Sequence, residues 1–145
     1  MKNITYKIVQ WSTPEELHQE CMDWLSQLEF IRDEQRFLDE LIAKYTIPLI
    51  SLEGDNTSLP IVIKLLKDEK KLNFLIDRVQ SHNNTFEKLL ETHIDVREKD
   101  ACKETHYYIK IAVFKYTADY RKMKSTLFKK IKEIMKKERP KKTSN

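Results

Sequence analysis

The sequence predicts an all-α protein, an elongated antiparallel three-helix bundle with coiled-coil-like seams that dimerisation would complete. Its 145 residues include one glycine and four prolines. So few turn-forming residues are enough for two or three connections but not for the many reversals of a β-sheet. Apolar residues also recur at alternating intervals of three and four over long stretches, which is the spacing of one helix face. The length is that of one domain, which we expect over residues 1–139.

The first helix is expected over residues 13–45. Thr13 is a good N-cap and Pro14 suits the first helical position. Glu16 stands three residues after Thr13, where it completes a capping box. The helix should end before Pro48, and its core-facing seam consists of Leu17, Cys21, Trp24, Leu28, Ile31, Gln35, Leu38, Ile42 and Tyr45.

The second helix is expected over residues 60–97, and a tight turn should follow near residue 100. The stretch 97–104 is mostly polar and interrupts the apolar spacing, and Asp100 suits the N-cap of the next helix. No glycine or proline enforces a turn there, so one unbroken helix and an earlier break near residue 82 stay open as alternatives. The seam of this helix runs through Ile61, Leu65, Leu72, Leu75, Val79, His82, Phe86, Leu89, His93 and Val96.

The third helix is expected over residues 101–138, and residues 140–145 are expected to form a disordered basic tail. Residues 1–12 make an N-terminal extension that is expected to fold back over part of the third helix. The main apolar face of that helix carries Ile109, Ala112, Val113, Tyr116, Tyr120, Met123, Leu127, Ile131 and Ile134.

Three apolar residues of the first helix, Phe30, Phe37 and Leu41, lie away from its seam. A helix that is apolar on two sides needs more neighbours than two partner helices provide. Exposed apolar stripes usually mark interfaces. We therefore expect this stripe to contact a partner, either a second copy of the chain in a homodimer or another protein.

Positive charge is concentrated at the C-terminal end. Residues 121–145 hold eleven Lys and Arg against two Glu, whereas the rest of the chain is net acidic. The lysines either complement the helix dipole and maintain solubility, or dock without sequence preference on a polyanion such as RNA or the ribosome. A third interpretation is a basic amphipathic helix that contacts an acidic protein or a membrane surface. The residues expected to make such contacts are Lys129, Lys130, Lys132, Lys136, Lys137, Arg139, Lys141 and Lys142.

Two histidines, His82 and His93, stand eleven residues apart on the seam of the second helix. They lie about 16 Å apart along a helix, so they do not share an ion whose bond to nitrogen measures about 2 Å. A turn near residue 100 would place His93 opposite His106 and bring His18 to the same end. The main interpretation is that these histidines are polar seam residues that set helix register. The alternative is an iron or zinc site formed by His18, His93 and His106 with neighbouring Glu residues.

The motifs of common enzyme classes are missing from this sequence. Glycine-rich phosphate loops and a Gly-x-Ser-x-Gly elbow both need more than the single Gly54, and no nucleophile–base pair is recognisable. Cys21 and Cys102 lack metal-ligand spacing and are expected to be free, packed thiols in the reducing cytoplasm. No apolar run has the length of a membrane span.

These observations predict a non-enzymatic, cytoplasmic regulator or adaptor that acts by association and needs no cofactor. Its basic end would dock on a polyanion or on an acidic protein. The alternative is a metal-binding helical bundle whose His and Glu residues gather at the opposite end.

Overall fold

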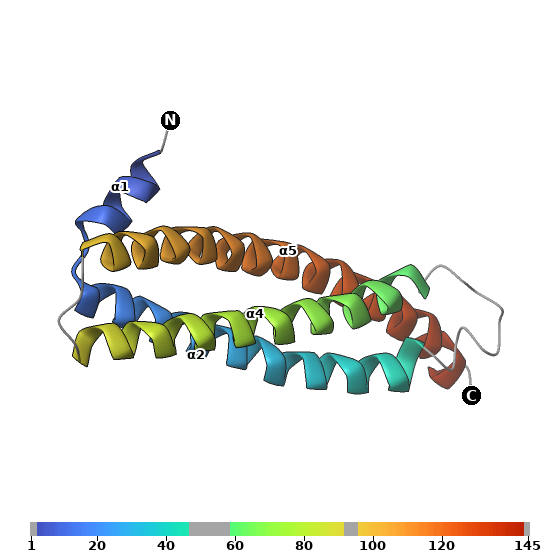
Figure 1. Ribbon diagram of the computed structural model, residues 1–145. Helices are drawn as coiled ribbons and strands as arrows, with labels where there is room; N and C mark the ends of the chain where they lie inside the picture. The colour runs from blue at the N-terminus through green and yellow to red at the C-terminus, as the bar shows by residue number, and fades with distance from the viewer. Residues whose placement is uncertain (1–2, 47–58, 92–95, 144–145) are drawn as a thin grey trace. The chain divides into compact units, whose positions relative to one another are not determined.

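The computed structural model describes residues 3–46, 59–91 and 96–143, which form helices and contain no strand. Helix α1 spans Ile4–Trp11, and α2 spans Pro14–Leu41 and continues into a π-helical turn, η1, at Ile42–Thr46. Helix α4 spans Leu59–Glu91 and α5 spans Val96–Thr143 (Figure 1). The predicted all-α class is confirmed for these residues.

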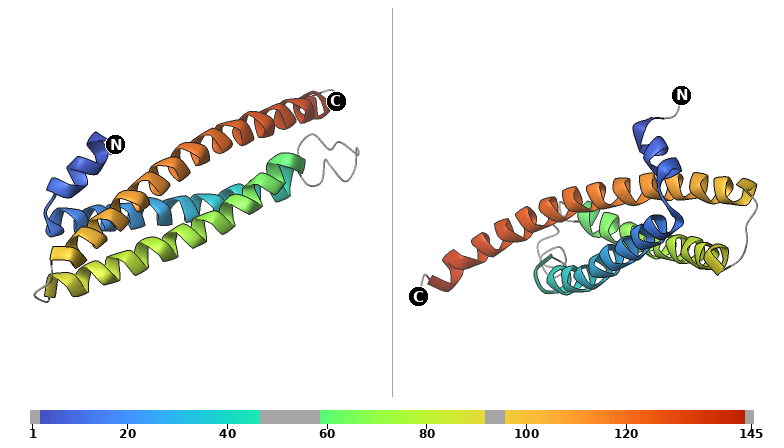
Figure 2. Two further views of the ribbon diagram at one scale, coloured as in Figure 1. Left: turned by 45° about the horizontal axis from the view of Figure 1, so that its top comes forward. Right: turned by 90° about the vertical axis from the view of Figure 1, so that its left-hand side faces the viewer.

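The chain divides into two compact units. Unit 1 consists of Met1–Phe30 and Leu72–Tyr116, and unit 2 of Ile31–Lys71 and Thr117–Asn145. Segments of α2, α4 and α5 therefore contribute to each unit, and α1 belongs to unit 1. Helix α1 lies beside the first part of α5 (Figure 2).

The start of α2 is the capping box that the sequence predicts. The backbone N–H of Thr13 donates to the Glu16 carboxylate at 3.0 Å, and the Glu16 N–H donates to the Thr13 hydroxyl oxygen at 3.2 Å. Two of the amides that lack partners within the helix are thereby satisfied. These hydrogen bonds hold the pKa of the Glu16 carboxyl below its ordinary value.

Most of the predicted seam residues that the structure describes are buried and form the core, whereas Tyr45, Leu89 and Ala112 are half-buried. In α2 the buried seam residues follow the alternating spacing from Leu17 to Ile42, and Gln35 is buried among them. The buried residues of α4 are Leu65, Leu72, Leu75, Ile76, Val79, His82, Asn83 and Phe86, and those of α5 are Cys102, His106, Ile109, Val113, Tyr116, Tyr120, Met123, Leu127 and Ile131.

The predicted turn near residue 100 is wrong. Helix α4 ends at Glu91 and α5 begins at Val96, so Asp100 lies inside α5 and is not its N-cap. The stretch 97–104 is helical because its Lys, Glu, Arg and Ala residues are strong helix formers. Cys102 continues the buried face one turn before His106. The alternative break near residue 82 is also wrong, because α4 is continuous there. The alternative of one unbroken helix is wrong as well, because α4 and α5 are separate helices.

The last helix is longer than expected, because α5 continues through Pro140 to Thr143 and does not end at 138. A proline near the C-terminal end removes one backbone donor, while the amides before it still pair with earlier carbonyls. The expected disordered tail from residue 140 is therefore wrong for 140–143, and 144–145 lie outside the described residues.

The N-terminal extension is helical and packs on α5, as expected from its apolar residues. The Tyr6 and Tyr107 rings meet edge to face with centroids 5.1 Å apart. The Lys103 ammonium donates to the Gln10 carbonyl at 2.7 Å. Val9 is fully buried in a cluster with Leu17, Phe86 and Cys102.

No described helix combines the length and the apolar character that crossing a membrane requires.

Candidate metal centre

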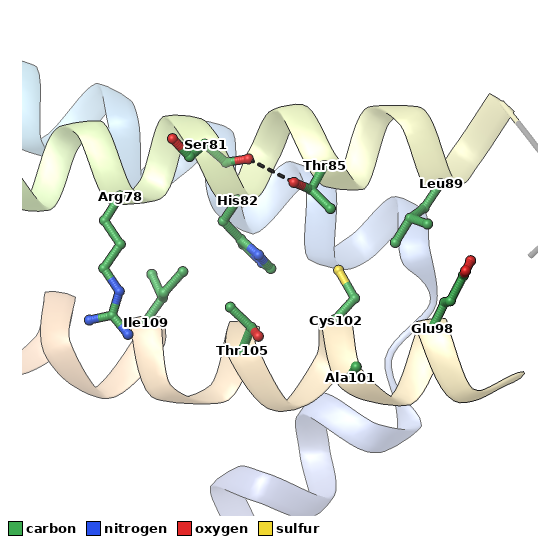
Figure 3. A pocket seen from close by; sticks show the side chains of 10 residues that line it. All are labelled: Arg78, Ser81, His82, Thr85, Leu89, Glu98, Ala101, Cys102, Thr105 and Ile109. Carbon is green, nitrogen blue, oxygen red and sulfur yellow. Dashed lines mark hydrogen bonds between the residues drawn. The ribbon is translucent and has the colours of Figure 1, made fainter. Parts of the chain in front are cut away.

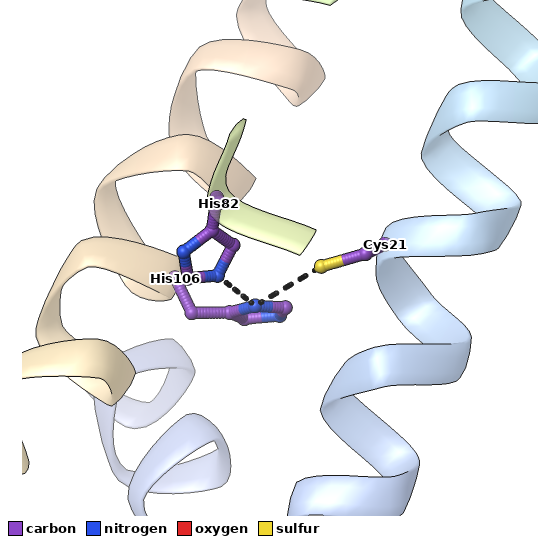
Figure 4. Close-up of side chains that lie close together, drawn as sticks. All are labelled: Cys21, His82 and His106. Atoms are coloured by element: carbon purple, nitrogen blue, oxygen red, sulfur yellow. Dashed lines mark hydrogen bonds between the residues drawn. The ribbon is translucent and has the colours of Figure 1, made fainter. Parts of the chain in front are cut away.

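Three potential metal ligands meet in the interior of unit 1, each from a different helix. Cys21 comes from α2, His82 from α4 and His106 from α5 (Figure 4). His82 Nε2 lies 3.0 Å from His106 Nδ1, and Cys21 Sγ lies 3.7 Å from the same nitrogen. All three ligand atoms lie within 4.8 Å of one another, and all three residues are buried.

A carboxylate orients the central histidine from behind. His106 Nε2 lies 2.7 Å from Glu20 Oε1, and the Lys110 ammonium donates to Glu20 Oε2 at 3.0 Å. An ionised carboxylate only accepts hydrogen bonds, so the ring nitrogen that faces it, Nε2, carries the proton. The lone pair of His106 is then on Nδ1. That lone pair points at His82 and Cys21. Metal-ligating histidines are commonly oriented in this way by a carboxylate on the other ring nitrogen.

Aromatic rings enclose the imidazoles. The Trp24 ring lies 4.6 Å from the His106 ring, centroid to centroid, and Phe86 lies 5.4 Å from His82 and 6.0 Å from His106. The His106 side chain is fully buried. Tight aromatic packing fixes the rotamers of both ligands and excludes water, so the ligand atoms are held in position before any ion arrives.

Two of the three ligands, His82 and Cys21, are uncharged at neutral pH in the absence of an ion. Burial lowers the pKa of His82 to about 4, with smaller contributions from His106 and the positive charge of Arg78. Burial raises the pKa of the Cys21 thiol to about 12, and the Glu20 charge and Cys102 add to this. At neutral pH His82 is therefore a neutral ligand, whereas Cys21 keeps a proton that a metal ion must displace.

Glu20 differs from these two groups. Burial alone would raise the pKa of this carboxyl. Hydrogen bonds from His106 and Lys110, and the positive charge of Lys110, outweigh burial and hold the pKa below its ordinary value. Glu20 therefore stays ionised, and its charge stabilises a proton on His106 Nε2.

The spacing of the three atoms suits a tetrahedral ion. With metal–nitrogen bonds near 2.0 Å and metal–sulfur bonds near 2.3 Å, two ligand atoms of a tetrahedral zinc site stand about 3.3–3.6 Å apart. The measured separations of 3.0 Å and 3.7 Å from His106 Nδ1 are close to those values. The third pair, Cys21 and His82, has its ligand atoms within 4.8 Å of each other.

A cavity of about 610 Å³ lies beside this cluster, between α4 and α5 (Figure 3). His82 belongs to both the cluster and the cavity wall. The other lining residues are Arg78, Ser81, Thr85, Leu89, Glu98, Ala101, Cys102, Thr105 and Ile109.

Of the three histidines in the predicted metal site, the structure places His106 in the cluster. His18 lies outside it, because its Nδ1 is paired with Asn83 Oδ1 at 2.7 Å. His93 lies outside the described residues. The predicted pairing of His93 with His106 followed from a turn near residue 100, and the observed helix bounds pair His82 with His106 instead.

Sequence reasoning missed Cys21 and His82 as ligands, although it placed both on core-facing seams. In an antiparallel helix pair, facing residues are equally far from the turn. His82 and His106 are equally far from residue 94, which lies between the end of α4 and the start of α5. Helix bounds of Glu91 and Val96 would have brought the two histidines together.

The predicted partner surfaces are partly visible. Phe30 and Phe37 are 66% and 52% exposed, and Leu41 is half-buried. Lys129, Lys132 and Lys136 are exposed and Lys130 is half-buried. The side chains of Lys137, Arg139, Lys141 and Lys142 lie outside the described part of the chain, and polyanion binding stays a prediction.

The two cysteines are free and buried, as predicted. Comparison with protein-family models, curated proteins and solved structures finds no match for this chain.

Proposed function

We propose that this chain binds a divalent transition metal ion, Zn²⁺ in the first instance, through Cys21, His82 and His106. The observation that supports this function is the convergence of a thiol and two imidazoles within 4.8 Å, with Glu20 on the far nitrogen of His106. A thiolate and imidazoles suit zinc, whereas magnesium and calcium prefer oxygen ligands. This is the metal-binding alternative of the sequence analysis with a different ligand set.

The deciding experiment is metal analysis of protein purified without a histidine tag. We expect one equivalent of metal per chain after loading with Zn²⁺ or Co²⁺. The cobalt form should show a near-ultraviolet thiolate-to-metal charge-transfer band. Cys21→Ser should remove this band, and His82→Ala or His106→Ala should weaken binding at least about 100-fold.

The chain offers matched controls. Cys102 is also buried but is not in the cluster, and His18 is bonded to Asn83. Cys102→Ser and His18→Ala should therefore leave the metal content at one equivalent. Circular dichroism of each variant establishes that it is still helical. A helical wild-type protein that takes up no cobalt, or that shows the same charge-transfer band after Cys21→Ser, would overturn the proposal.

A second candidate function is association through the outer face of α2, the main interpretation of the sequence. Phe30 and Phe37 stand two helical turns apart and are more than half exposed. Burying the exposed parts of these two side chains stabilises an interface by roughly 1–2 kcal/mol each. A second copy of the chain is the partner that we propose for this face.

Light scattering at micromolar concentration tests this association. We expect twice the 17.5 kDa mass of the single chain, and the single-chain mass for Phe30→Asp combined with Phe37→Asp. Phe74→Asp is the matched control, because Phe74 is 73% exposed on a different helix. A wild-type protein with the mass of one chain, or a double variant that remains a dimer, would reject this face as the dimer interface.

We also propose that α2, α4 and α5 form an antiparallel three-helix bundle. Within unit 1 each pair of these helices is in contact. A hydrogen bond between His18 and Asn83 joins α2 to α4. Glu20 and His106 join α2 to α5 in the same way, and His82 and His106 join α4 to α5. Three mutual contacts of this kind support a bundle in which every helix packs on the other two.

A further inference from the structure

The Cys21–His82–His106 cluster supplies three ligand atoms, and a tetrahedral ion takes four. Protein zinc sites with four protein ligands are structural, whereas sites with three protein ligands keep the fourth position for water or a substrate. Among the described residues, the group that converges on this point consists of these three residues. The carboxylate of Glu20 is engaged with His106 Nε2 and Lys110.

Charge favours an anion in the remaining position. A divalent ion with one thiolate and two neutral imidazoles carries a net charge of about +1. The Glu20 carboxylate behind His106 is itself paired with Lys110, so it does not cancel this charge in full. A charge left uncompensated in a buried site is costly. One monoanion on the metal would make the centre neutral.

The neighbouring cavity has the chemistry to admit such an anion. Its volume of about 610 Å³ is within the usual range for small-ligand sites. His82 forms part of its wall, so an ion on His82 would lie next to it. Arg78 and Glu98 stand towards opposite ends of the cavity (Figure 3).

We propose that the metal held by Cys21, His82 and His106 keeps an exchangeable coordination position. The cavity between α4 and α5 admits a small monoanion, of the size of a carboxylate, to that position. Arg78 attracts the anion at its end of the cavity, and the hydroxyl of Thr105 lies beside its path. This inference rests on the proposed metal function and makes the centre a ligand-binding site as well as a structural one.

The test uses the full-length protein loaded with one equivalent of Co²⁺ and titrated with sodium azide. Azide on cobalt changes the visible d–d bands, whereas the thiolate charge-transfer band reports that Cys21 stays bound. We expect saturable changes in the d–d bands with the charge-transfer band retained. Arg78→Gln should weaken azide binding about tenfold, because it removes a charge-assisted contact, and should leave the thiolate charge-transfer band in place.

Two further variants test whether the anion reaches the metal through the cavity between α4 and α5. Thr105→Leu places a larger side chain in the cavity and should weaken or abolish the azide response without loss of cobalt. Arg121→Gln removes an exposed cation of α5 in unit 2 and should have no effect on azide binding.

The outcomes separate the two proposals. Cobalt bound with thiolate charge transfer but indifferent to azide would show a saturated centre, and would overturn the exchangeable position while leaving metal binding intact. Azide binding that is unchanged in both Arg78→Gln and Thr105→Leu would overturn the cavity route. A protein that binds no cobalt would remove the proposed function and this inference together.

Discussion

The two units bury polar groups on their helical seams in different ways. In unit 1, two buried imidazoles and a buried thiol have ligand atoms that converge on one point, whereas the buried Asn83 pairs with His18. In unit 2 the buried Gln35 donates to Asp68 at 2.6 Å. Tyr120 and Lys124 both donate to Glu34, at 2.7 Å and 2.9 Å.

The difference lies in the kind of atom that is buried. In unit 2, donors meet carboxylate oxygens, and the hydrogen-bond pairs are complete without any ion. In unit 1, the His82 nitrogen and the Cys21 sulfur both pair with His106 Nδ1. The same nitrogen and sulfur atoms are the ligand types that a soft or borderline metal ion prefers. A polar residue on a seam can therefore set register or bind a ligand, and the atom types distinguish the two roles.

The largest effect is expected from His106→Ala. This change removes a fully buried ring and leaves Glu20 and His82 without their shared partner. We expect the metal-free protein to lose about 3 kcal/mol of unfolding free energy, measured by urea denaturation, and metal affinity to fall at least about 100-fold.

Two matched variants sharpen that result. His106→Gln retains a donor to Glu20 and should recover part of the stability but none of the metal affinity. Gln35→Ala is the counterpart in unit 2 and should cost about 1–2 kcal/mol with no change in metal binding. Equal effects of His106→Ala and Gln35→Ala on metal affinity would contradict the distinction between the units.

The next effect is the pH dependence of metal affinity. The pKa of the Cys21 thiol is about 12, so this group releases one proton when it binds metal at neutral pH. Between pH 7 and pH 9 the dissociation constant should fall about tenfold per pH unit, measured by competition with a chelator of known affinity. A flat profile, or an equal slope in Cys21→Ser, would show that the thiolate is not a ligand.

Acid stability of the metal-free protein should depend on His82. Its folded-state pKa is about 4, below the ordinary value of 6.5. As the pH falls from 6.5 to 4, the unfolded chain takes up a proton that the folded chain does not, so stability falls, by about 2 kcal/mol. His82→Gln keeps a donor towards His106 but does not titrate, so it should reduce this loss in urea denaturation at pH 7 and pH 4. An unchanged loss in the variant would contradict the assignment.

The smallest effect is expected in unit 2 and has the opposite sign. Burial, and then the neighbouring Asp39 and Asp68, raise the pKa of Glu69 from 4.5 to about 7. As the pH rises from 4.5 to 7, the unfolded chain loses a proton that the folded chain retains, so stability falls. Glu69 is partly exposed, and solvent screening limits this loss to less than about 1 kcal/mol. Glu69→Gln should reduce the pH dependence of the unfolding free energy between pH 4.5 and pH 7, measured by urea denaturation. An equal or steeper fall in the variant would contradict the assignment to Glu69.

Much of the fold follows from local patterns. The capping pair Thr13 and Glu16 and the alternating spacing of α2 predicted its start and its buried face, because both depend on residues a few positions apart. The error at residue 100 has a physical cause. A polar stretch of helix formers has no local signal that separates a turn from a solvated first turn of helix, and packing on the partner helix decides between them.

The candidate site was predicted less well than the core. The seams identified Cys21, His82 and His106 as inward-facing residues, but not which of them meet. That pairing depends on where α4 ends and α5 begins. The observed bounds, Glu91 and Val96, go with His82 opposite His106, whereas a turn near residue 100 would have placed His93 there. Glu20 is not on the seam, and its contact with His106 across two helices has no signature in either local segment.

By itself the sequence determined the helical class, the faces that are buried and the residue types available in the interior, because helix periodicity and composition act over short distances along the chain. The tertiary structure alone decided that a thiol and two imidazoles from three helices converge on one point beside a cavity, with a carboxylate on the far nitrogen of one imidazole. The register between packed helices is set by the fit of many side chains at once, and no single stretch of sequence contains that information.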